Sequence, residues 1–323
     1  MGDRAERVVA IVGFESAELL DIACVTTGLA LANALGDPGT PYRVRVLSPG
    51  GAPVRCGTGL TLAGVESLER ARGPLDTLVV SGGLGVERFA ADPRLVGHVR
   101  RLSRESRRVA SVCTGAAVLA AAGLLDGRRA TTHWQFAPCL ADGYPEVRVD
   151  AAPLWIRDGN VYTSAGITSA LDLTLALIEE DHGPEPARRV ARHLVVHMQR
   201  PGDQSQMSAF TAAAPPREDT VRVLAAHIAA HPNEDLSTPV LAARAGLTSR
   251  HITRLFTRCL GEPPGRYVRR VRTETAAQLL LSSALPVASV AVRCGFGTPE
   301  ALRKAFLDHY GVSPTGYREG ARR

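Results

Sequence analysis

The C-terminal third of the chain contains one pattern twice, and this internal repeat constrains the fold more than any other feature. The first copy covers residues 241–267 and the second covers residues 290–317. Five residue types recur 50 positions apart: Thr248/Thr298, Phe256/Phe306, Gly261/Gly311, Pro264/Pro314 and Tyr267/Tyr317. The preceding glycines, Gly246 and Gly295, are 49 positions apart, so the second copy has a turn that is one residue longer. The repeat predicts two equivalent helical units.

Each copy has the sequence pattern of a helix-turn-helix unit. A short Ala-rich helix is followed by a glycine where the chain can reverse with positive φ, and then by a threonine that can cap the next helix. That second helix has one apolar stripe, formed in the first copy by Ile252, Leu255 and Phe256. A plain helical hairpin with a solvated outer face is the alternative for a single copy, and the duplication argues against it.

The side chains opposite the apolar stripe lie in the first two turns, where a recognition helix meets the edges of DNA bases. They are Arg250, Thr253 and Arg254 in the first copy and Glu300, Arg303 and Lys304 in the second. Between the copies, residues 266–281 predict an amphipathic helix with four outward arginines, Arg266, Arg269, Arg270 and Arg272. This helix is about 24 Å long at ~1.5 Å per residue. Together with the flanking turns, it can place two recognition helices about 34 Å apart, which is one turn of DNA.

The charge distribution agrees with a nucleic-acid partner. Residues 1–200 contain 22 basic and 22 acidic side chains, whereas residues 201–323 contain 16 basic and 10 acidic ones, so the net charge of +6 lies in the C-terminal part. A concentrated positive charge favours a polyanionic partner, and a solvated basic surface without a partner is the alternative.

On these motifs, the segment from about 219 to 320 resembles the DNA-binding domain of the AraC/XylS family. The resemblance implies double-stranded DNA as the partner and base contacts from the six outward side chains of the two second helices. Pro299 replaces the polar residue that the family often has there, so the first helical position of the second unit should read no base through a hydrogen bond.

The first part of the chain has a different pattern, in which short β-rich runs alternate with Ala/Leu-rich amphipathic stretches. The strands that it predicts are residues 8–12, 44–47, 78–81, 109–112 and 161–164. This alternation predicts an α/β fold, a flavodoxin-like sandwich with a mainly parallel sheet, joined to an all-α domain with two helix-turn-helix units. We expect domains at 1–184 and 218–323, with a connecting helix and a breaker-rich linker at 185–217.

The composition favours a cytoplasmic protein without a cofactor or a bound metal. The six cysteines are scattered, without the spacing of a disulfide framework or a zinc site. No segment is long and apolar enough to suggest a membrane span, and the N-terminus lacks the pattern of a signal peptide.

One cysteine occupies a position of chemical interest. Cys113 stands at a sharp turn between a predicted strand and a helix, where the helix N-terminus favours a thiolate and nucleophilic reactivity. Gly82 and Gly83 end another strand and could offer bare backbone N–H groups to an oxyanion. An inert packing cysteine is the alternative, and it is the interpretation that we give to the other five.

Residues 8–182 resemble the ThiJ/PfpI superfamily, which is itself similar to class I glutamine amidotransferases. The resemblance rests on Cys113, on the glycine pair 82–83, and on the segments 131–133 and 20–23. It implies that Cys113 is the elbow cysteine, that His133 lies near it, and that Asp21 can share a proton with the sulfur. Thr114 follows the cysteine, where protease-like members have histidine and isonitrile-hydratase-like members share the threonine.

The two modules together resemble the GlxA-type branch of AraC-family regulators. We therefore predict a sequence-specific transcription regulator that is not an enzyme. Its N-terminal domain should form a homodimer and sense a small-molecule effector or a redox signal at Cys113. The alternative is a cysteine-dependent hydratase or amide hydrolase fused to a DNA-targeting domain. General nucleoid binding is a third interpretation, and the paired recognition helices argue against it.

Overall fold

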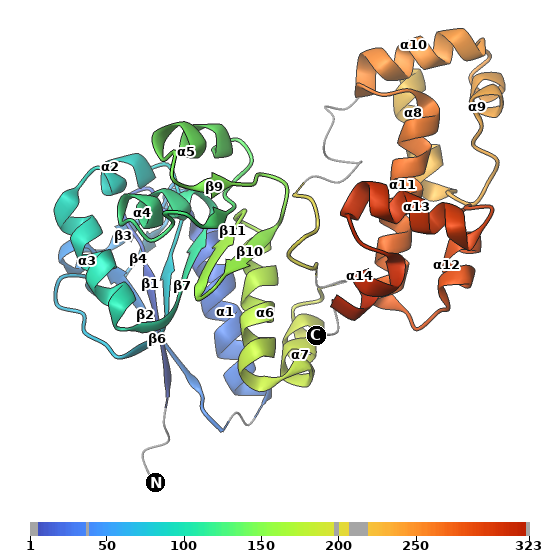
Figure 1. Cartoon of the computed structure of the whole chain (residues 1–323). Coiled ribbons are helices and arrows are strands. Elements are labelled where there is room, and N and C mark those ends of the chain that lie inside the picture. Colours follow the sequence, from blue (N-terminus) through green and yellow to red (C-terminus); the bar gives the residue numbers. More distant parts are fainter. Residues whose placement is uncertain (1–5, 37–38, 197–199, 207–218, 321–323) are drawn as a thin grey trace. The chain divides into compact units, whose positions relative to one another are not determined.

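The chain folds into two compact units, Met1–Gln206 and Met207–Arg323 (Figure 1). The computed structural model describes residues 6–36, 39–196, 200–206 and 219–320. No helix of these described residues is long and apolar enough to cross a membrane.

The first unit is built on a seven-stranded sheet with the order β10-β11-β7-β6-β1-β2-β5. The strands are β1 (Arg7–Val12), β2 (Tyr42–Ser48), β5 (Glu66–Ser67), β6 (Leu75–Val80), β7 (Ser106–Val112), β10 (Trp155–Asp158) and β11 (Val161–Ser164). All neighbours pair in parallel except β10, which is antiparallel to β11. The central strands are continuous apolar runs because helices cover both faces of a parallel sheet. The predicted fold class is confirmed, and each of the five predicted strands lies in this sheet.

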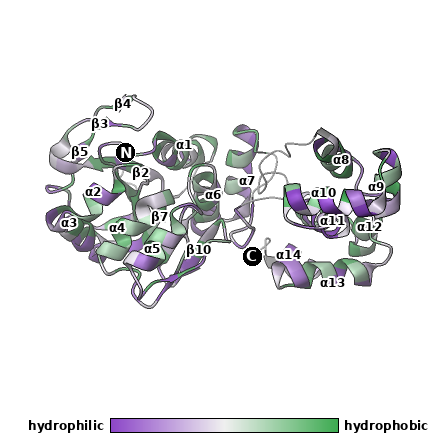
Figure 2. Cartoon of the chain, turned by 90° about the horizontal axis from the view of Figure 1, so that it is seen from above, coloured by the Kyte–Doolittle hydropathy of each residue, from purple (hydrophilic) through white to green (hydrophobic). Residues whose placement is uncertain are grey.

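Helices pack on the sheet in two groups (Figure 2). One group contains α1 (Leu19–Leu35), α6 (Ser169–His182) and α7 (Pro184–His193). The other contains α2 (Val86–Ala90), α3 (Pro93–Arg104) and α4 (Ala116–Ala121), with α5 (Ala137–Gly143) further along the chain. The short elements are the hairpin β3 (Val54–Arg55) and β4 (Thr61–Leu62), the pair β8 (Arg129–Ala130) and β9 (Arg148–Val149), and the 3-10 turns η1 (Pro49–Gly51) and η2 (Cys113–Gly115).

The boundary of the first unit differs from the prediction. The helix expected within the connecting segment 185–217 is α7, which packs on α1 and α6 and buries Ala187 and Val190. Residues 200–206 also hydrogen-bond to the first unit. Because α7 is buried against the first unit and residues 200–206 bond to it, the first unit extends to Gln206. The rest of the predicted linker, 207–217, lies outside the described residues.

The second unit contains helices only among its described residues. They are α8 (Asp219–Ala230), α9 (Thr238–Arg244), α10 (Ser249–Leu260), α11 (Pro264–Ser282), α12 (Val287–Arg293), α13 (Pro299–Tyr310) and α14 (Pro314–Gly320). Two separate hydrophobic clusters share α11, one centred on the fully buried Phe256 and the other on the fully buried Phe306. The helix predicted at residues 266–281 is therefore the element that the two helix-turn-helix units share.

The turns of the two helix-turn-helix units have the predicted backbone. Gly246 and Gly295 adopt φ values of 65° and 75°. Thr248 caps α10 by accepting a hydrogen bond from the His251 N–H at 3.3 Å, and Thr298 caps α13 by accepting one from the Ala301 N–H at 3.1 Å. The repeated glycine and threonine thus act in the same way in both copies.

Candidate functional site

The outer face of α10 exposes two positive charges. Arg250 and Arg254 are exposed, and neither forms a hydrogen bond or an ion pair with another described residue. Thr253 is half-buried, and its hydroxyl donates to the Ser249 carbonyl at 2.8 Å. These two exposed guanidinium groups in the first two turns can pair with phosphates or with the O6 and N7 of guanine.

The equivalent face of α13 is different, because its arginine already has a partner. The Arg303 guanidinium donates to the Glu300 carboxylate through Nε at 2.9 Å and through Nη2 at 2.8 Å, and both of these side chains are exposed. The hydrogen bond from Arg303 lowers the pKa of Glu300. Lys304 is exposed and has no partner among the described residues. The two recognition helices therefore present unequal charge to a ligand.

Three of the four arginines expected to point outward from α11 have partners within the second unit, and of these Arg269 is exposed as predicted whereas Arg270 and Arg272 are half-buried. Arg269 forms an ion pair with Asp308 of α13 at 2.6 Å, and Arg270 forms one with Glu262. The sequence spacing did not reveal these two partners, because Asp308 lies on α13 and Glu262 lies in the turn before α11.

Arg272 is the third of these arginines with a partner. Its Nε and Nη2 donate to the Pro232 and Glu234 carbonyls, each at 2.7 Å, and burial lowers the pKa of its guanidinium. A Cβ at Gly295 would lie 2.2 Å from the Pro232 oxygen, so the turn of the second helix-turn-helix packs directly against the Pro232 carbonyl. Only Arg266 remains exposed without a partner among the described residues.

Cys113 lies in the predicted strand-turn-helix elbow of the first unit. β7 ends at Val112, Cys113 opens η2 with a φ of 55°, and α4 begins at Ala116. A positive φ at a non-glycine residue is strained and persists only when the surroundings enforce it. The elbow packs closely against Gly82 and Gly166, because an added Cβ would lie 2.6 Å from the Cys113 Cβ at Gly82 and 2.3 Å from it at Gly166.

The thiol of Cys113 is protonated at neutral pH, contrary to the expected thiolate. Cys113 is only 7% exposed, and burial together with the nearby Asp21 carboxylate raises the pKa of the thiol to about 12. The Thr114 N–H has the opposite effect, but it is the smaller one. Desolvation therefore outweighs the helix N-terminus at this position.

Asp21 reaches the elbow from the first turn of α1. Its carboxylate is 1% exposed and accepts hydrogen bonds from the Gly82 N–H and the Ile167 N–H, each at 2.9 Å. Burial raises the pKa of this carboxyl group to about 6, although both hydrogen bonds lower it. Asp21 thus ties together the ends of β6 and β11 beside the sulfur.

The glycine pair does not offer the bare amides that were expected. The Gly82 N–H donates to Asp21, and the Gly83 N–H donates to the Thr114 hydroxyl at 2.9 Å. That hydroxyl also donates to the Gly83 carbonyl at 3.1 Å. Both N–H groups already have an acceptor, so the expected oxyanion donors are wrong for this structure.

His133 does not form a hydrogen bond with Cys113 among the described residues. Its Nδ1 accepts from the Gln135 N–H at 3.4 Å, and burial lowers the pKa of the ring. The preceding Thr132, which the sequence analysis did not single out, is the residue in contact: its buried hydroxyl donates to the Cys113 carbonyl at 2.7 Å. In the sequence, the run Thr131-Thr132-His133 is the signal that could have indicated this contact.

Two families match the two units. The DJ-1/PfpI family matches residues 7–180 and a helix-turn-helix domain matches residues 241–320. The chain is 34% identical to the HTH-type transcriptional regulator CdhR of Pseudomonas aeruginosa, over 85% of this chain and 81% of the relative. It is 32% identical to the HTH-type transcriptional regulator GlxA of Rhizobium meliloti, over 93% of this chain and 92% of the relative.

Two further proteins are similar to this chain. The chain is 39% identical to the isonitrile hydratase of Pseudomonas putida, over 44% of this chain and 60% of that enzyme. A solved ThiJ/PfpI family protein from Pseudomonas syringae superposes with a TM-score of 0.56 at 22% identity, over 70% of this chain and 87% of that one. The solved structure supports the fold of the first unit.

Proposed function

We infer that this chain, which belongs to the DJ-1/PfpI family and to the HTH-type transcriptional regulators related to GlxA, controls transcription by binding specific DNA through α10 and α13. The duplicated helix-turn-helix unit, whose first recognition helix exposes Arg250 and Arg254 without a partner among the described residues, is the observation that carries this proposal. The excess positive charge of residues 201–323 supports it.

The test is footprinting of the full chain on DNA from its own genomic neighbourhood, with unrelated duplex DNA as competitor. We expect two protected segments about one helical turn apart, because each recognition helix enters one major groove. Uniform protection, or loss of all protection in the presence of competitor, would contradict specific binding.

For the first unit we propose dimerisation and effector sensing in the cytoplasm, without turnover. Three features support the absence of catalysis: a Cys113 thiol with a raised pKa, amides of Gly82 and Gly83 that already have acceptors, and a His133 that forms no hydrogen bond with Cys113 among the described residues. A regulator needs its site to be occupied, which shifts a population of conformations, and does not need product release.

Hydration of an isonitrile is the second candidate, favoured by the identity to the Pseudomonas putida enzyme and by Thr114. The two candidates predict different kinetics. Multiple turnovers of an isonitrile by the wild-type chain, abolished by Cys113→Ser, would establish the enzyme. Absence of isonitrile turnover, together with a dimer in sedimentation that persists without DNA, would support the sensor.

A further inference from the structure

The last described segment of the first unit lies along the edge of its sheet. Residues 200–206, which we call the strap, run beside β10 (Figure 1). The Leu154 N–H donates to the Gln204 carbonyl at 2.9 Å and the Trp155 N–H donates to the Gly202 carbonyl at 3.1 Å. At its start, the Arg200 guanidinium donates to the Asp172 carboxylate at 2.6 Å. The strap is therefore bound at several points, although its Arg-Pro-Gly composition is typical of a linker.

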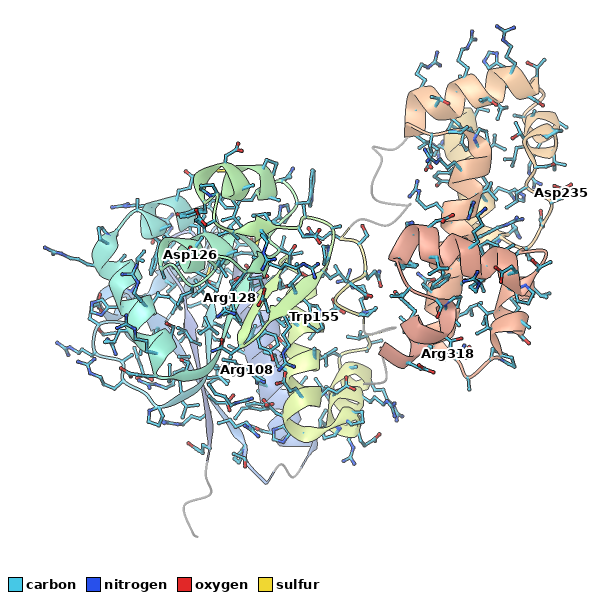
Figure 3. The ribbon with its side chains drawn as sticks, viewed as in Figure 1. Arg108, Asp126, Arg128, Trp155, Asp235 and Arg318 are labelled. Atoms are coloured by element: carbon cyan, nitrogen blue, oxygen red, sulfur yellow. The ribbon has the colours of Figure 1, made fainter. Side chains whose placement is uncertain are left out.

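The tightest fit along the strap is at Gly202. A Cβ there would lie 2.7 Å from the ring of Trp155, the first residue of β10, which is labelled in Figure 3. Only glycine allows the strap to cross this ring.

Gln206 anchors the far end of the strap with its whole carboxamide. Nε2 lies within hydrogen-bond distance of the Thr131 hydroxyl at 3.1 Å, the Thr132 carbonyl at 2.9 Å and the Pro153 carbonyl at 3.1 Å. Oε1 accepts from the Trp134 N–H at 3.1 Å, and the Gln206 N–H donates to the Ala152 carbonyl at 2.8 Å. This is the residue at which the first unit ends.

Thr132 connects this anchor to the cysteine elbow. Its carbonyl accepts from Gln206, and its hydroxyl donates to the Cys113 carbonyl at 2.7 Å. The Cys113 backbone itself has a strained φ of 55°, and Gly166 packs closely against it. Two hydrogen bonds on one residue thus separate the elbow from the point where the chain leaves the first unit.

We propose that the strap is a conformational switch: it is docked while the elbow holds its strained form and is released when a ligand that binds at the elbow moves the Thr132 segment. Seven released residues can span up to about 23 Å at ~3.3 Å per residue. Release would lengthen the tether between the first unit and the DNA-binding unit. In the proposed dimer two DNA-binding units are linked, and a longer tether changes the effective concentration at which the second one meets DNA once the first is bound. The proposal rests on the function proposed above.

Hydrogen exchange of the full chain, read by mass spectrometry on peptides that carry Leu154, Trp155 and Gln206, tests the link. Thr132→Val removes the bond to the Cys113 carbonyl and should speed exchange in these peptides about fivefold, the effect of one net hydrogen bond. Thr132→Ser keeps a hydroxyl and should restore protection. Thr174→Val is the matched control, because its equally buried hydroxyl donates to a carbonyl at 2.7 Å within α6.

Two further variants release the strap without altering the elbow. Gly202→Ala and Gln206→Ala should both raise exchange in the strap, and each should shift operator affinity in the same direction as Thr132→Val. Exchange in Thr132→Val that equals the wild type would overturn the link. Faster exchange with unchanged operator affinity in all three variants would overturn the regulatory role. Failure of the wild-type chain to bind specific DNA would refute the proposed function instead, and the exchange data would still decide the link.

Discussion

The reactivity of Cys113 tests the electrostatic description of the elbow. Burial and the Asp21 charge raise the pKa of this thiol from its ordinary value of 9.0 to about 12. Below pH ~9 the thiolate fraction is then about 1,000-fold smaller than for an ordinary thiol. Iodoacetamide should therefore label the exposed Cys139 long before Cys113 at neutral pH, and the rate at Cys113 should keep rising from about pH 8 to about pH 10.

Asp21→Asn separates the two causes of this shift. The substitution removes the negative charge and leaves the burial, so Cys113 should be labelled faster than in the wild type but still more slowly than Cys139. Glu18→Gln is the control, because this half-buried carboxylate raises the pKa of Cys113 less than Asp21 does. Peptide mass spectrometry over a time course gives each rate. Labelling of Cys113 ahead of Cys139 in the wild type, or unchanged labelling in Asp21→Asn, would refute the argument from burial and charge.

Three further changes test the DNA-binding unit. Arg250→Ala should cost about 1–3 kcal/mol of operator binding and relax preference at one base pair, which a titration against single-base operator variants would show; unchanged preference would remove the assignment. Glu300→Gln should release Arg303 from its ion pair and strengthen binding, whereas weaker binding in the same titration would mean that Glu300 itself contacts a base. Phe256→Ala should destabilise the cluster around α10 by about 3–5 kcal/mol in urea unfolding, and a loss below about 1 kcal/mol would contradict its role in the core.

Local spacing predicted much of the fold, because the signals are local. Apolar runs predicted the buried strands, and the repeated glycine and threonine predicted turns whose backbone needs a positive φ and an N-cap. The pair of Glu300 and Arg303 also had a local signal, since side chains three residues apart on a helix face each other.

The properties of the elbow could not be predicted in the same way, because they depend on residues far apart in the chain. The pKa of Cys113 depends on burial and on Asp21, which is 92 positions away. Arg272 finds its acceptors 40 and 38 positions away. Gln206 docks on Thr131 across 75 positions from within a segment whose composition is typical of a linker.

The most direct test of specific regulation is a competition measurement with the full chain at roughly physiological salt. A labelled operator found by footprinting is bound, and unlabelled operator or a scrambled duplex of the same length and composition is added. Specific recognition predicts at least a ~1,000-fold preference for the operator, the lower end for sequence-specific proteins. It also predicts an affinity for either duplex that falls steeply with rising salt. Equal displacement by the operator and the scrambled duplex would contradict sequence-specific regulation by this chain.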